Sequence, residues 1–114
     1  METELLNLLI PAGLLDYFDI EKINKNKESI NIYLVEKNTQ PEEYSNQKLI
    51  SKGFFEEESV RDFPLRGFSC FLKLKRRKWL NQDTGKIVYR DWNLVANGMR
   101  KTSEFAFVLK GAFR

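Results

Sequence analysis

The stretch from residue 68 to residue 80 constrains the fold of this chain most strongly, because apolar and charged residues alternate along it. Successive side chains of a β-strand point to opposite faces. One face of such a strand would carry Phe68, Cys70, Leu72 and Leu74, and the other would carry Phe71, Lys73, Lys75, Arg77 and Trp79. The pattern therefore predicts a strand with one face in the core and one cationic, aromatic face.

A turn and a returning strand follow this stretch. Residues 81–85 read Asn-Gln-Asp-Thr-Gly, which is rich in turn-forming residues, and residues 86–92 are rich in β-branched and aromatic residues. Two strands joined by such a turn form an antiparallel pair. We therefore predict a long basic β-hairpin over residues 68–92.

Shorter strands are predicted in the first half of the chain. Residues 18–20 and 30–34 alternate between apolar and polar on either side of a polar turn at residues 24–27, so they predict an antiparallel hairpin. Residues 48–54 predict another short strand, and the acidic run at residues 56–58 predicts a solvated loop.

A helix is predicted at each end of the chain. Apolar residues at helical spacing predict a short helix over residues 2–10, and Thr102 or Ser103 can cap a C-terminal helix. We therefore expect one α+β domain over residues 1–114, in which a short N-terminal helix and a C-terminal helix accompany a mainly antiparallel sheet of about four to six strands.

Charge is distributed unevenly along the chain. Residues 1–60 hold six Lys and twelve Asp or Glu, whereas residues 61–114 hold thirteen Lys or Arg and four Asp or Glu, and the net charge is +3. Such an asymmetry between halves indicates a charged partner, and the basic half favours a polyanion such as nucleic acid. The alternative is a soluble domain whose charges serve solubility alone.

The chain lacks the residues that most catalytic and metal sites need. It has no His and a single Cys, Cys70, so it cannot form an internal disulfide or the usual zinc-ligand sets, which fits a reducing cytoplasm. Without His, the Ser-His and Cys-His nucleophile pairs are excluded, and no two carboxylates are spaced as an acid/base pair. No run of about 18 apolar residues is present. We therefore expect a cytoplasmic protein that is not an enzyme and uses no metal, cofactor or membrane.

Five cations cluster on the predicted basic strand, between two aromatic residues. The cations are Lys73, Lys75, Arg76, Arg77 and Lys78, and Phe71 and Trp79 flank them. Lys and Arg neutralise phosphates, a two-stranded ribbon fits the major groove of DNA, and aromatic rings can stack on unpaired bases. We therefore predict a nucleic-acid site here that Arg90, Arg100 and Lys101 extend. The alternative is an edge strand that is protected from aggregation by charge.

Motifs over residues 60–110 resemble a known family. They are Arg61-Asp62-Phe63-Pro64-Leu65-Arg66-Gly67, Leu72-Lys73-Leu74-Lys75-Arg76-Arg77-Lys78-Trp79, Arg90-Asp91-Trp92-Asn93 and Gly98-Met99-Arg100-Lys101-Thr102. In this order they resemble the N-terminal region of bacterial insertion-sequence transposases, and they are similar to the zinc-ribbon module that opens a related transposase family. That module has paired cysteines on both sides of its arginine strand, and this chain has none there, so the resemblance implies a zinc-ribbon-like fold without zinc.

The resemblance is closer to a stand-alone form, in which a short reading frame holds this region and the catalytic DDE domain is encoded separately. It implies a non-catalytic protein of a mobile element that binds DNA at the element ends during transposition. The alternative is a protein-interaction module that docks on the separately encoded catalytic subunit, with the acidic N-terminal half as the docking surface.

Overall fold

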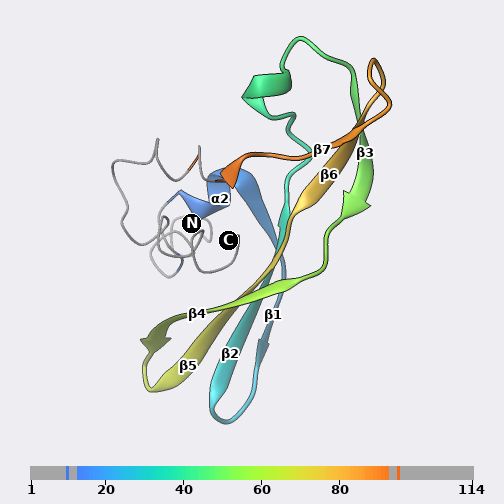
Figure 1. Ribbon diagram of the computed structural model, residues 1–114. Helices are drawn as coiled ribbons and strands as arrows, with labels where there is room; N and C mark the ends of the chain where they lie inside the picture. Colours follow the sequence, from blue (N-terminus) through green and yellow to red (C-terminus); the bar gives the residue numbers. More distant parts are fainter. Residues whose placement is uncertain (1–9, 11–12, 93–94, 96–114) are drawn as a thin grey trace.

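The computed structural model describes residues 10, 13–92 and 95, and two β-sheets make up most of this part of the chain (Figure 1). The first sheet has the strand order β1-β2-β5-β4, and the second has the order β3-β6-β7. Along the chain, the elements are α2 (Leu14–Tyr17), β1 (Phe18–Lys25), β2 (Ser29–Glu36), the 3-10 turn η1 (Glu42–Tyr44), β3 (Leu49–Phe54), β4 (Glu58–Leu65), β5 (Phe68–Lys75), β6 (Arg77–Asn81) and β7 (Ile87–Val88).

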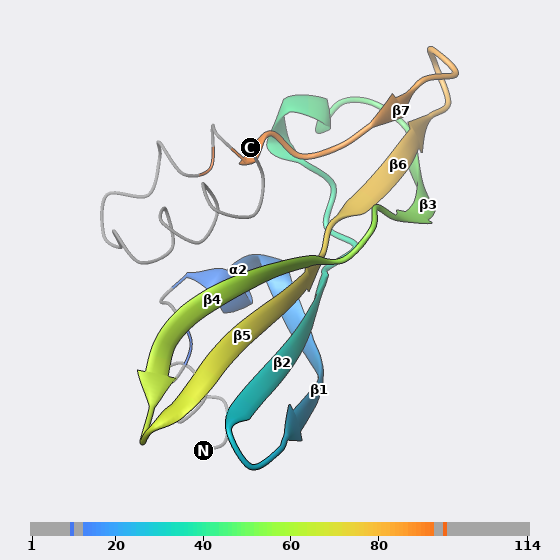
Figure 2. The same ribbon diagram turned by 60° about the horizontal axis from the view of Figure 1, so that its bottom comes forward.

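The first sheet is mixed and consists of two hairpins laid side by side, as Figure 2 shows. In the hairpin of β1 and β2, the Asn26 side chain accepts hydrogen bonds from the backbone N–H groups of Glu28 and Ser29, which holds the turn. In the hairpin of β4 and β5, Arg66 and Gly67 form a two-residue turn with φ angles of 49° and 83°. The two hairpins meet where β2 pairs with β5 in parallel.

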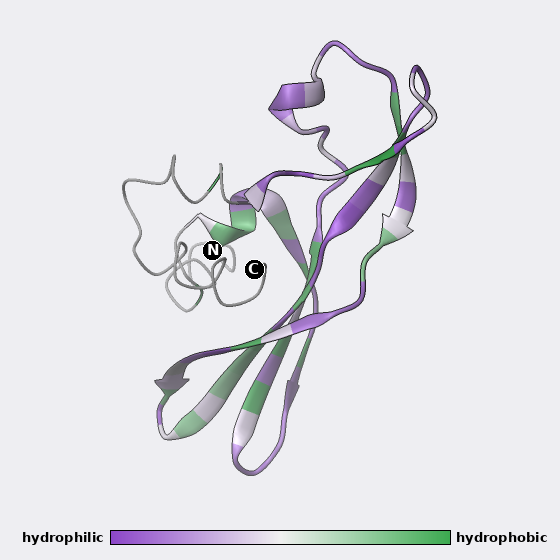
Figure 3. Cartoon of the chain, in the orientation of Figure 1, coloured by the Kyte–Doolittle hydropathy of each residue, from purple (hydrophilic) through white to green (hydrophobic). Residues whose placement is uncertain are grey.

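The core lies on one face of the first sheet, beneath α2. It consists of Ile10, Leu14, Phe18, Ile32, Leu34, Val60, Cys70, Leu72, Leu74 and Trp92. The ring of Trp92 stacks on Phe18 with 5.3 Å between ring centres. Full burial of an apolar side chain of this size contributes about 1.5–3 kcal/mol, so this face supplies most of the driving force for folding in the described part. Hydropathy alternates along β2 and β5 accordingly (Figure 3).

The predicted long basic hairpin is corrected by the structure, because the strand breaks at Arg76. β5 lies between β2 and β4 in the first sheet, whereas β6 continues into the second sheet and pairs with β3 and β7. Only Trp79 and Leu80 pair with the returning strand, opposite Val88 and Ile87. The break has a physical cause: β5 buries Cys70, Leu72 and Leu74, whereas β6 buries Trp79 and Asn81. Leu74 and Trp79 are an odd number of residues apart, so their side chains would point to opposite faces of one unbroken strand. Such a strand could not turn both the buried residues of β5 and those of β6 toward one core.

Other expectations are confirmed or corrected in the described part of the chain. The hairpin of β1 and β2 and the strand β3 confirm the predictions for residues 18–34 and 48–54. The mainly antiparallel expectation holds for the second sheet, while the first sheet is mixed. Glu56 and Glu57 are exposed in a loop, but Glu58 begins β4, a strand that the sequence reasoning missed. The predicted helices over residues 2–10 and at the C-terminus lie outside the described residues, apart from Ile10.

Candidate nucleic-acid interface

The face of the first sheet opposite to the core carries the cationic and aromatic side chains of β5, and we call it the outer face. Strand register places two rows of four residues across its centre. One row is Lys22, Tyr33, Lys73 and Ser59, and the next is Asn24, Asn31, Phe71 and Arg61. Neither row contains a carboxylate. The prediction that Phe71, Lys73 and Lys75 share a face opposite to Cys70, Leu72 and Leu74 is confirmed for β5.

Cations lie beside both aromatic rings of the outer face. The Nζ atom of Lys22 lies 4.6 Å from the centre of the Tyr33 ring. The Nζ atom of Lys73 and the Cζ atom of Arg61 lie 5.7 Å and 6.0 Å from the centre of the Phe71 ring. Cations at these distances are attracted to the ring quadrupole. The two central rows of the outer face are therefore positively charged and hold partly exposed rings, and the row beyond Tyr33 and Lys73 adds the carboxylate of Asp19.

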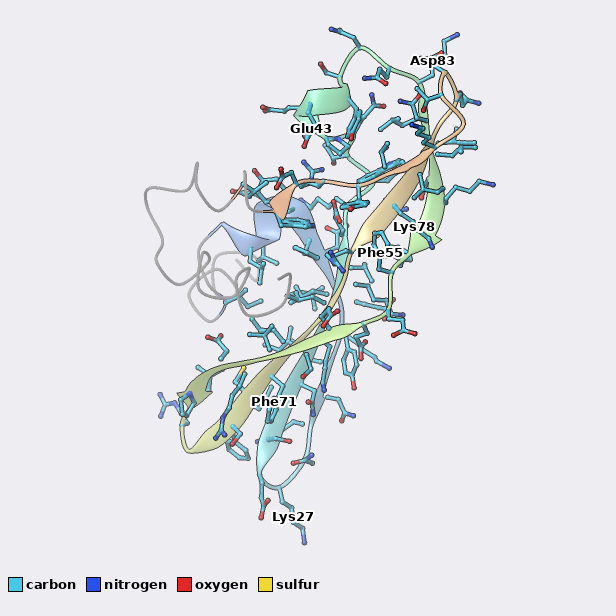
Figure 4. The ribbon with its side chains drawn as sticks, in the orientation of Figure 1. Lys27, Glu43, Phe55, Phe71, Lys78 and Asp83 are labelled. Atoms are coloured by element: carbon cyan, nitrogen blue, oxygen red, sulfur yellow. The ribbon has the colours of Figure 1, made fainter. Side chains whose placement is uncertain are left out.

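A second group of rings and cations lies where β5 passes into β6, and we call it the junction cluster. Its centre is Phe55, whose ring lies 4.9 Å from the Cζ atom of Arg76 and 5.3 Å from the Nζ atom of Lys78. The Tyr89 ring meets Phe55 edge to face at 5.3 Å. Figure 4 shows Phe55 and Lys78 next to each other, with Phe71 further along on the first sheet. Arg76 and Lys78 are thus held against an aromatic surface.

Two of the predicted contact residues, Arg77 and Arg90, are instead bound to Glu36. Arg90 is 7% exposed, and its Nε atom donates to Glu36 Oε2 at 3.0 Å. The backbone N–H of Arg77 donates to Glu36 Oε1 at 2.8 Å, and its Nε atom donates to the Glu36 carbonyl oxygen at 3.2 Å. Burial raises the pKa of the Glu36 carboxyl, and the hydrogen bonds from Arg77 and Arg90 oppose this effect. The expectation that Arg90 extends the basic patch is wrong, because its side chain is buried and its charge is paired with Glu36.

Trp79 also departs from its predicted position. The expectation that it shares the outer face with Lys73 and Lys75 is wrong, because Trp79 is only 1% exposed. Its indole Nε1 donates to Asn38 Oδ1 at 3.0 Å, in the loop that follows β2. The shift of alternation at Arg76 turns Trp79 inward, so its ring is not available for stacking on a base. Arg100 and Lys101 lie outside the described residues.

The structure thus brings Lys73 and Lys75 together on the outer face and places Arg76 and Lys78 in the junction cluster. Sequence reasoning missed Lys22, Tyr33 and Arg61, which join the outer face from β1, β2 and β4. The alternation along β2 could have placed Tyr33 on the face opposite to the core, since Ile32 and Leu34 on either side of it are apolar. The sequence contained no signal that β2 would pair with β5.

The described residues offer few other groups that could bind a metal ion or react. No group of three or more His, Cys, Asp or Glu side chains among them could hold a metal ion. Burial and the nearby Asp62 raise the pKa of the Cys70 thiol, which is fully buried in the core. Within the described part of the chain, no helix is long and apolar enough to span a membrane. Comparisons with protein-family models, with curated proteins and with solved structures found no match.

Proposed function

We propose that this protein is a non-catalytic DNA-binding protein of an insertion-sequence transposition system, and that it contacts element ends through the outer face and the junction cluster. The observation that carries the proposal is the arrangement of Lys22, Arg61 and Lys73 around two central rows that hold no carboxylate. A polyanion that lies on these rows meets only positive or neutral side chains. Binding releases the counterions of the contacted phosphates, which favours association.

The assignment to transposition rests on the motif resemblance over residues 60–110. In the stand-alone form that these motifs resemble, the catalytic domain is encoded separately. Finding a reading frame for a DDE transposase directly downstream would support this assignment. A toxin gene in that position would overturn it, and the DNA-binding proposal would then be tested by itself.

The DNA-binding proposal is tested by the salt dependence of affinity for a labelled duplex, measured by fluorescence anisotropy. The slope of log affinity against log salt is negative. In the double variant Lys73→Ala, Lys75→Ala, each lost phosphate contact should reduce the magnitude of this slope by about 0.9, or by about 1.8 for the pair. These side chains point away from the core, so the variant should remain folded.

The matched control is Lys27→Ala, Lys86→Ala. It removes the same charge from two exposed positions in the β1–β2 turn and just before β7. Its salt slope should stay close to that of the wild type. If the magnitude of the salt slope falls by the same amount in both double variants, the effect comes from net charge and the outer face is not the binding site.

A second candidate function is docking on a separately encoded catalytic subunit, and one observation favours it. Most of the large exposed apolar side chains in the described residues gather on or beside the second sheet: Ile50 (43%), Phe54 (38%), Ile87 (47%) and Tyr89 (52%). Ile50 and Ile87 flank Leu80 in one row of this sheet. This position differs from the acidic docking surface expected from the sequence. Co-purification of the subunit encoded downstream, and its loss in Ile50→Ser, Ile87→Ser, would support docking.

A further inference from the structure

We propose that the outer face binds an unpaired DNA strand, with bases stacked on Tyr33 and Phe71 and phosphates held by Lys22, Arg61 and Lys73. This inference rests on the proposed DNA-binding function and names the form of DNA that the site takes. Its evidence is the placement of two aromatic rings on the central strands of an open, cationic sheet.

The two rings lie on adjacent strands and in adjacent rows. Tyr33 is opposite Lys73, and Phe71 is opposite Asn31, so the rings are diagonal neighbours across the pairing of β2 with β5. Strand spacing and rise put their Cα atoms roughly 8 Å apart. A four-stranded sheet with rings on its central strands can stack two or three bases of a single strand. Bases stacked here would lie across the sheet, with the backbone passing over the flanking cations.

The cations are placed for the backbone of such a strand. Lys22 and Arg61 are exposed on the edge strands β1 and β4, while Lys73 lies between them on β5. Lys22 now covers the Tyr33 ring at 4.6 Å. Its flexible side chain can leave the ring for a phosphate at little energetic cost, since exposed cation–π contacts are weak. Asn24, Asn31 and Ser59 in the same rows supply polar groups for base edges.

A DNA duplex would contact fewer of the groups on this face. Its bases are stacked on one another, so protein rings on a sheet cannot reach the faces of the bases, and only phosphates remain to be contacted. Partly exposed rings at the centre of a cationic surface contribute nothing to phosphate binding. The rings therefore favour an unpaired strand over a duplex.

The test compares a labelled oligothymidine with a labelled duplex of mixed sequence, by anisotropy at one salt concentration. Wild-type protein should bind the single strand more tightly. Tyr33→Leu and Phe71→Leu should each weaken single-strand binding about tenfold and change duplex binding less than twofold. Tyr33→Phe and Phe71→Tyr keep the rings and should bind as the wild type does. Tyr44→Leu, in η1, is a control for the loss of a ring elsewhere.

Several outcomes would overturn the inference. If the Leu variants weaken both forms of DNA equally, or if the wild type binds duplex and not the single strand, the inference fails and the proposed DNA binding stands. If the wild type binds neither form, the proposed DNA binding fails as well.

A second measurement uses wild-type protein only, so it does not depend on the folding of the Leu variants. Oligothymidine with a photoreactive halogenated uracil is crosslinked, and the crosslinked peptides are mapped by mass spectrometry. Crosslinks to Tyr33 or Phe71 support the inference, and crosslinks confined to other segments contradict it.

Discussion

At the scale of single residues, Glu36 connects parts of the chain that are far apart in sequence. Its carboxylate accepts hydrogen bonds from the backbone of Arg77 at the start of β6 and from the side chain of Arg90, which follows β7. The Glu36 side chain is fully buried, and that of Arg90 is 7% exposed. Removing one partner of such a pair leaves a buried charge unpaired, which typically costs about 3–5 kcal/mol.

The raised pKa of Glu36 makes a prediction about pH. Because its pKa in the folded state lies above the ordinary value of 4.5, the folded state holds this proton more tightly than the unfolded state does. The stability that Glu36 contributes is therefore fully present below about pH 4.5 and is lost as the pH rises through the folded-state pKa.

The variant Glu36→Gln does not titrate at this position and serves as the reference. The free energy of unfolding of the wild type, relative to that of Glu36→Gln, should decrease as the pH rises above about 4.5. Urea unfolding of both proteins at several pH values measures this difference, and the other carboxylates cancel in the comparison. An increase with pH would mean that pairing with Arg90 outweighs burial.

At the scale of elements, turns and strand breaks decide which faces the strands present. Arg66 is the one non-glycine residue with positive φ in the described part of the chain, and Gly67 beside it also has positive φ. Positive φ at both central positions is typical of the type I′ turn, for which Asn-Gly is favoured. The turn holds β4 against β5 and so positions Arg61 beside Phe71.

We therefore predict that Arg66→Asn stabilises the protein. Asn tolerates the left-handed conformation better than Arg, so the free energy of unfolding should rise by about 0.5 kcal/mol. The urea midpoint at unchanged slope measures the gain. Arg66→Ala, which removes the same charge without easing the backbone conformation, is the control and should not show it. An equal gain in both variants would assign the effect to charge instead.

At the scale of the whole molecule, the acidic and basic halves of the sequence are interleaved in space. β2 comes from residues 1–60 and lies directly beside β5 from residues 61–114, and β3 likewise lies beside β6. The outer face can therefore take Lys22 and Tyr33 from the acidic half. The acidic run at residues 56–58 leads from β3 into β4 and adjoins Phe55 of the junction cluster.

Charge reversal in this acidic run gives a prediction at the same scale. The variant Glu56→Lys, Glu57→Lys, Glu58→Lys should bind DNA as tightly as the wild type or severalfold more tightly, because it removes negative charge beside the basic surface. The gain should shrink at high salt, where charges are screened over about 3 Å at 1 M. Anisotropy at two salt concentrations measures both effects. A large loss of affinity would show that these carboxylates take part in binding or folding.

The sequence by itself determined the local features of this protein. Alternation in residues 68–75 was enough to assign the two faces of β5, and alternation around a polar turn was enough to predict the hairpin of β1 and β2. These features depend on the period of a strand and on turn chemistry, which neighbouring residues set.

Only the tertiary structure decided which strands pair and where the basic strand breaks. Tyr33 lies opposite Lys73 because β2 pairs with β5. Arg90 is buried because it meets Glu36, 54 residues earlier in the chain. Trp79 turns inward because the alternation shifts at Arg76, where the chain passes from one sheet to the other. Contacts between residues so distant in sequence produce no periodic pattern in the local sequence. The alternation of residues therefore predicted a basic strand, but packing determined which of its cations remain on the surface.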